Sequence, residues 1–179
     1  MLDVIEFKES DTLYILGDVV DHRPDSIKIL HDMMLRSNVF GIIGNHELMM
    51  VECLNFLCDE ITDTSLDAFN EEKLMKLSEW IYNEASPTIE AFKKFDMVEK
   101  EEILEYLMEF TIYEEVEVHG RFYILVHARF ASSDDYDIHD FVWNRLDFDK
   151  PCFSGSKYIV VGHTPTLGIT GEPEIIYKL

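Results

Sequence analysis

The sequence predicts a single α/β domain, and the pattern of its apolar residues carries this prediction. Four short apolar runs stop at glycine or polar residues, as buried strands do where they end in loops. These runs cover residues 12–16, 39–43, 122–126 and 158–161. Other stretches place apolar residues at helical spacing. The chain has 179 residues, 47% of them hydrophobic, which suffices for one domain with a sizeable core. We therefore expect residues 1–179 to form one domain.

Strand, helix and strand follow one another near the start of the chain. Residues 25–35 show helical spacing behind Asp25, a residue type favoured as a helix cap. This order predicts a right-handed crossover between two parallel strands. Residues 46–110 are mostly helical in pattern, with a break at Ser86-Pro87.

An antiparallel hairpin is predicted after the helical block. Residues 111–118 alternate apolar and acidic side chains and meet the next strand through His119-Gly120. Within the block, the charged stretch 99–105 is typical of a solvent-facing helix surface.

The charge of the chain excludes some partners. It has 36 acidic and 15 basic residues, a formal charge of −21, which repels nucleic acid and anionic membranes. The same field repels phosphate, so a phosphate site would need bound cations. We expect no nucleic-acid or membrane partner.

Compartment and cysteine state follow from two further features. The first residues lack a secretory pattern, and no long uncharged apolar run occurs, so we expect a cytoplasmic protein. Cys53, Cys58 and Cys152 are sparse and have no zinc-type spacing, which favours reduced thiols.

Four short motifs carry the chemistry of this sequence: GDVVD, GNHE, VHA and GHTP. Each alone is common as a turn or a helix cap. Together they appear in order, each at the carboxyl end of a predicted core strand, where open α/β sheets place ligand sites. Their combination therefore favours a functional site over four unrelated turns.

With these motifs, residues 11–165 resemble the calcineurin-like metallophosphoesterases, and among them the bacterial and phage serine/threonine phosphoprotein phosphatases. The resemblance implies a four-layer α-β-β-α sandwich with a helical insertion at about 46–110. It also implies two divalent metals. Asp18 would bridge them, and Asn45, His127 and His163 would complete one site. Carboxylate, carboxamide and imidazole ligands suit manganese first, with iron or zinc as alternatives.

The resemblance assigns further roles. A metal-bound hydroxide would attack the phosphate, and His46, oriented by Asp21, would be the general acid. Arg145, Arg23 and Asn45 would bind substrate, the arginines through their forked donors.

The sequence also departs from the family pattern. The Asp-x-His-Gly strand that precedes the GD motif in the family is not found in this sequence, and neither are the family's last strands. We therefore expect a domain truncated at both ends, a second metal site without its main ligands, and impaired activity. His22 stands where the family has arginine, and Glu84 and Arg129 stand where it has glycine.

Several functions stay open on these grounds. The chain would hydrolyse a phosphorylated protein or a small phosphoester, cut a dinucleoside polyphosphate, or act as a non-catalytic module that binds phosphate or protein. An exposed sheet edge would also favour self-association.

Overall fold

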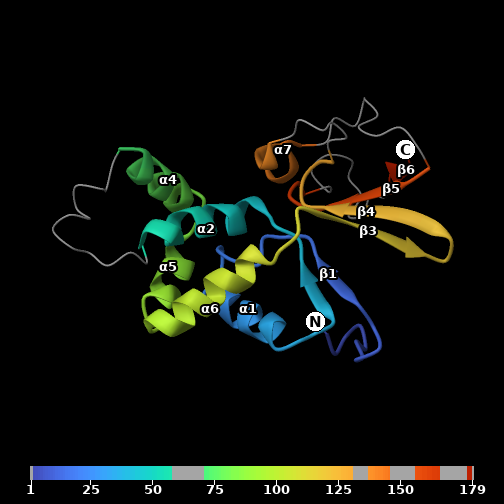
Figure 1. Cartoon of the computed structure of the whole chain (residues 1–179), viewed down its shortest axis with the longest axis horizontal. Helices are drawn as coiled ribbons and strands as arrows, with labels where there is room; N and C mark the ends of the chain where they lie inside the picture. Colours follow the sequence, from blue (N-terminus) through green and yellow to red (C-terminus); the bar gives the residue numbers. More distant parts are fainter. Residues whose placement is uncertain (1, 58–70, 131–136, 146–155, 166–176, 179) are drawn as a thin grey trace.

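A computed structural model describes residues 2–57, 71–130, 137–145, 156–165 and 177–178 of the chain (Figure 1). It contains two β-sheets, one of two strands and one of four, together with helices that gather mainly on one side of the molecule. This is the mixed α/β class that the sequence predicts. The assignment of residues 1–179 to one domain stays a prediction.

The first strand, helix and strand form the predicted crossover. Strand β1 (Leu13–Ile15) pairs in parallel with β2 (Val39–Gly41), and helix α1 (Ser26–Met34) connects them. The buried residues of α1 recur at helical spacing and include Ile27, Leu30 and Met33.

The expected cap of this helix differs in detail. Asp25 occupies the N-cap position of α1, but its side chain makes no cap hydrogen bond. The carboxylate pairs with Lys28 instead. An exposed lysine three residues ahead therefore competes successfully with the backbone N–H groups for the Asp25 oxygens.

Helices fill the region that the sequence predicts as an insertion. They are α2 (Asn45–Leu57), α4 (Glu71–Tyr82), α5 (Ser86–Phe92) and α6 (Met97–Met108). The Ser86-Pro87 break lies at the start of α5, where proline fits because no N–H is needed there. Helix α2 packs against both α4 and α6. The acidic residues of 99–105 are largely exposed, while Ile103 from the same stretch is buried.

The predicted hairpin joins β3 (Tyr113–Val118) to β4 (Arg121–Val126) in antiparallel register. Both turn residues, His119 and Gly120, have positive φ, the geometry that two-residue hairpins favour. Strand β5 (Tyr158–Val161) then adds in parallel to β4, and β6 (Tyr177–Lys178) pairs with β5. The short helix α7 (Ile138–Val142) lies beside this sheet (Figure 1).

The hydrophobic core joins residues of both sheets and of the helices. Its largest fully buried side chains include Trp80, Phe141 and Leu30. Cys53 is buried and free, as expected, whereas Cys58 and Cys152 lie outside the described residues. In the described part of the chain, helices long and apolar enough to cross a membrane are absent.

Candidate metal centre

The four motifs meet at one place in the fold. Asp18 follows β1, Asn45 begins α2 just after β2, His127 follows β4 and His163 follows β5. Strands β1 and β2 belong to one sheet, and β4 and β5 belong to the other. Packing of the two sheets therefore brings together Asp18 and His163, which are 145 positions apart in the sequence. The structure thus brings together all four side chains that the sequence predicts as metal ligands.

Short distances join these four side chains. The Asn45 Oδ1 atom lies 3.0 Å from Nε2 of His127 and 3.1 Å from Nδ1 of His163. The two imidazole nitrogens are 3.2 Å apart. Asp18 Oδ1 lies 3.4 Å from Nε2 of His127. One oxygen or nitrogen from each residue therefore faces a common point.

The hydrogen bonds of His127 and Asp18 leave one lone pair of each residue available at that common point. The Nδ1–H group of His127 donates to the carbonyl of Leu16 at 2.6 Å, which leaves its Nε2 free to act as a ligand. Asp18 Oδ1 is buried and has no hydrogen-bond partner. Burial lowers the pKa of His163, and the neighbouring His127 adds to this effect despite the opposing charge of Asp18. These donors fit a cation, because otherwise a buried carboxylate oxygen would remain unsatisfied.

The donor chemistry indicates the class of metal. Two imidazoles, one carboxylate and one carboxamide oxygen suit a borderline transition metal such as manganese, iron or zinc. Among the described residues, Asp18, His127 and His163 form the one cluster of three or more acidic, cysteine or histidine ligands close enough to share an ion.

A buried carboxylate that the sequence reading missed holds this site together. Glu47 is fully buried and accepts hydrogen bonds from four backbone N–H groups. They belong to Asp18 (2.8 Å), Val19 (2.7 Å), Val20 (3.1 Å) and Gly44 (3.0 Å). Burial and the charge of Asp18 raise the pKa of Glu47, and the backbone N–H groups oppose this rise. Glu47 thus ties the loop after β1 to the loop after β2.

Two glycines allow these loops to approach each other. A Cβ on Gly17, whose φ is +79°, would lie 2.6 Å from Gly44 Cα and from Nδ1 of His127. A Cβ on Gly44 would lie 2.7 Å from Asp18 Oδ1 and 2.8 Å from Glu47 Oε2. Any larger residue would displace the ligands themselves.

His46 and Asp21 form a buried pair beside the metal ligands. Nδ1–H of His46 donates to Asp21 Oδ2 at 2.7 Å, and Trp80 Nε1–H donates to the same oxygen at 2.9 Å. The Asp21 N–H in turn donates to Thr88 Oγ1 at 2.8 Å. Trp80 and Thr88 were missed as site residues.

The surroundings of His46 favour its protonated form. Burial opposes protonation, but the hydrogen bond to Asp21 and the charge of Asp18 outweigh it, so the pKa of His46 is raised. A histidine that holds a proton beside a metal site is suited to general acid chemistry.

The predicted substrate arginines lie at the surface. Arg145 is exposed, and its charge is close enough to His163 to contribute to the lowered pKa of that residue. Arg23 is exposed too, and its side chain makes no hydrogen bond or ion pair with another described residue. The structure brings neither into direct contact with the four ligands, so their substrate-binding roles stay predictions.

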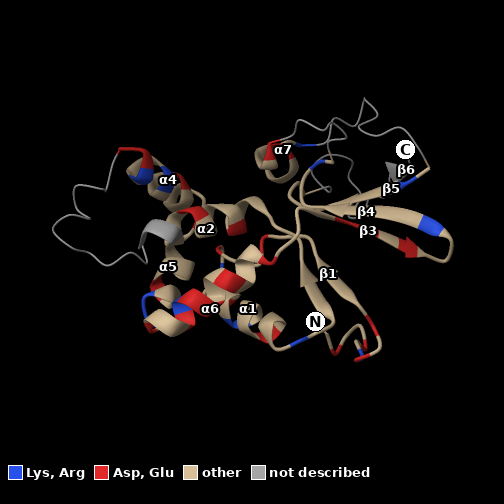
Figure 2. Cartoon of the chain, viewed as in Figure 1, with Lys and Arg blue, Asp and Glu red and all other residues tan. Residues whose placement is uncertain are grey.

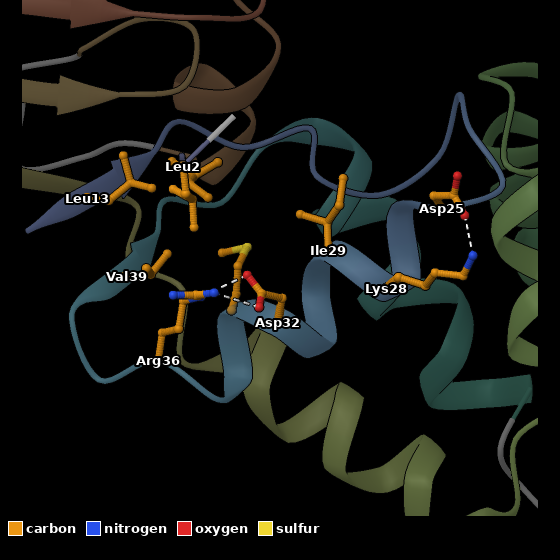
Figure 3. Close-up of a pocket in the computed structure, with 10 residues that line it drawn as sticks. Leu2, Leu13, Asp25, Lys28, Ile29, Asp32, Arg36 and Val39 are labelled. Carbon is orange, nitrogen blue, oxygen red and sulfur yellow. Dashed lines mark hydrogen bonds and ion pairs between the residues drawn. The ribbon is translucent and has the colours of Figure 1, made fainter. Parts of the chain in front are cut away.

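An apolar cavity lies away from this centre. It has a volume of about 410 Å³ between α1 and the β1–β2 sheet, and Leu2, Leu13 and Ile29 line it (Figure 3). The charged residues at its rim pair with one another, as Asp32 does with Arg36. It offers no catalytic group.

Comparisons with known proteins agree with the site. A family model described as calcineurin-like phosphoesterase matches residues 1–178. The chain is similar to a symmetrical bis(5'-nucleosyl)-tetraphosphatase of Wigglesworthia glossinidia brevipalpis, with 31% identity over 103 residues, 55% of this chain and 37% of that protein. A protein of the same description from Nitrosospira multiformis is 28% identical over 81 residues, 42% of this chain and 30% of that protein. The matched regions thus span 37% and 30% of these two relatives.

Proposed function

Because the chain belongs to the calcineurin-like phosphoesterase family, we propose that it hydrolyses phosphoesters with the help of divalent metal, and that dinucleoside polyphosphates are its substrates. The observation that carries this proposal is the convergence of Asp18, Asn45, His127 and His163 with an unpartnered carboxylate oxygen. The relatives described as tetraphosphatases support the choice of substrate.

The metal would be held by these four side chains, and manganese is the ion we propose first. When bound, such a metal supplies positive charge that attracts phosphoryl oxygens and lowers the pKa of water. This charge matters here because acidic residues are spread over the helices and strands (Figure 2) and the chain carries −21 overall. A phosphate could not otherwise approach easily.

We assign acid catalysis, positioning and substrate binding to residues of the chain. His46 donates its proton to the oxygen that leaves phosphorus, a contribution of roughly 10²–10⁴-fold in rate. Asp21 fixes the His46 ring, and Trp80 fixes Asp21. Arg23 and Arg145 are proposed to bind the charged substrate, together with the carboxamide of Asn45.

Hydrolysis of three substrates tests the proposal. Purified chain with added Mn²⁺ should cleave diadenosine tetraphosphate faster than phenyl phosphate or a phosphoserine peptide. Chelation, or substitution of a ligand as in His127→Ala, should abolish cleavage, while the exposed His139→Ala control should not. The same hydrolysis rates test whether turnover is weak, as the sequence leads us to expect. Preference for the phosphopeptide would instead support a serine/threonine phosphatase.

A non-catalytic binding module is the second candidate. It is favoured by Glu84, whose carboxylate pairs with His22 next to the His46 ring and adds negative charge where phosphate would enter. Metal bound in stoichiometric amount, with no cleavage of any of the three substrates, would select this candidate.

A further inference from the structure

A second carboxylate–histidine pair lies beside the catalytic one. His22 Nδ1 is 2.8 Å from Glu84 Oε2, and the side chains are 46% and 70% exposed. The His46–Asp21 pair has nearly the same distance, 2.7 Å, but its side chains are 7% and 0% exposed. The chain thus carries one buried and one exposed pair of the same chemistry.

The two histidine rings are in contact. Their centroids are 4.4 Å apart, with an interplanar angle of 57°. His22 is thus a more exposed neighbour of the almost buried His46 ring. A group that receives a proton from the His46 ring would therefore lie near His22.

The backbone of this exposed pair is unusual. His22 has φ +54° and Glu84 has φ +68°, a region that residues other than glycine adopt rarely and at about 1–3 kcal/mol each. Glu84 is the second residue after α4, a position at which a left-handed residue is usually glycine. Two side chains thus occupy positions at which glycine would be the easier choice.

The residues next to His22 and Glu84 are held in place by hydrogen bonds. The N–H of Asp21, next to His22, donates to Thr88 of α5. Ala85, next to Glu84, is buried and donates its N–H to the carbonyl of Trp80. Within the described residues, His22 uses Nδ1 on Glu84 and leaves Nε2 without a hydrogen-bond partner. That nitrogen is free to meet a ligand.

We propose that His22, oriented by Glu84, contacts the leaving group and selects one that carries anionic phosphate oxygens. This inference rests on the proposed function. In its protonated form, the Nε2–H of His22 donates to a phosphate oxygen of the departing nucleotide while His46 protonates the oxygen that leaves phosphorus. A leaving group without phosphate offers His22 no such acceptor.

The test compares leaving groups. In His22→Asn, which keeps a residue that tolerates positive φ, kcat/KM for diadenosine tetraphosphate should fall by about 10–100-fold, as expected when a hydrogen bond to a charged group is lost. The kcat/KM for phenyl phosphate should stay within about threefold of that of the unaltered chain, a smaller change than the loss of one such hydrogen bond causes. Glu84→Gln should show the same selectivity with a smaller loss. His119→Asn, another exposed histidine with positive φ, is the matched control.

A binding measurement accompanies the rates. Calorimetry with manganese-loaded protein and a methylene-bridged, non-hydrolysable tetraphosphate analogue should show weaker binding to His22→Asn than to His119→Asn. Equal losses for both substrates would mean that His22 merely supports His46, and unchanged values would mean that it has no role; either result overturns the inference while leaving the proposed function intact. Absence of both cleavage and binding in the unaltered chain would overturn the two together.

Discussion

At the scale of single residues, the metal site depends on a side chain that binds no metal. Asp18 has φ +55°, and the N–H groups of residues 18–20 converge on the carboxylate of Glu47. A buried carboxylate that accepts four N–H bonds fixes the loop that carries Asp18. Asp18 is held in this conformation by Glu47.

Glu47→Gln is therefore expected to weaken metal binding. The amide group of glutamine would direct its own N–H atoms at backbone donors, so the loop after β1 should loosen. We expect the dissociation constant for Mn²⁺ to rise by about 10–100-fold, as for other residues that orient metal ligands. Calorimetry measures it. Glu52→Gln, on the surface of the same helix, is the control, and equal affinities in the two variants would contradict this role.

At the scale of elements, the helical block supports the His46–Asp21 pair. Trp80 lies on α4 and is fully buried, yet its indole N–H reaches Asp21 in the loop after β1. Thr88 on α5 holds the backbone of the same residue. Helices α4 and α5 thus fix the orientation of His46 through Asp21.

Trp80→Phe should separate catalysis from metal binding. Loss of the indole N–H leaves a buried oxygen of Asp21 with one partner fewer, and we expect a loss of about 1–3 kcal/mol in unfolding free energy. We also expect kcat to fall while Mn²⁺ affinity stays within about twofold, because Trp80 touches none of the ligands. Steady-state kinetics and calorimetry measure these quantities. Tyr82→Phe, exposed at the end of α4, serves as control; a parallel loss of metal binding would contradict this division.

At the scale of the whole molecule, the β1–β2 sheet is small and open. Strand β1 pairs only with β2 among the described residues. The N–H of Leu13 and the carbonyl of Ile15 form hydrogen bonds with residues that flank β2. Because successive residues of a strand alternate in direction, the N–H and C=O of Tyr14 point away from β2. A groove lined by Tyr14, Val116 and Leu125 lies along this edge.

This edge leads us to propose self-association. Unpaired strand edges pair with other chains, while the charge of −21 opposes contact between copies, so added salt should strengthen association. Sedimentation velocity should show a larger species that grows with protein and salt concentration. Tyr14→Pro, which removes the outward N–H, should prevent it, provided that circular dichroism shows an intact fold. A monomer at all concentrations would contradict the proposal.

The sequence by itself determined the α/β class, the crossover, the hairpin at His119-Gly120 and the strand ends at which the four predicted ligands lie. These features are local, because an apolar run that stops at a glycine or a polar residue marks a strand end wherever the strand later packs. The convergence of the four predicted ligands follows from the same pattern, since each lies at or just beyond a strand end.

Only the tertiary structure decided what holds these residues in place. Glu47 clamps backbone groups that lie 27–29 residues earlier in the chain, Trp80 reaches Asp21 across 59 residues, and His22 meets Glu84 across 62. These three contacts form only when the helices pack against the loops, and no local sequence pattern predicts that packing. A buried carboxylate and an exposed ion pair look like ordinary charged residues until packing gives each its partner.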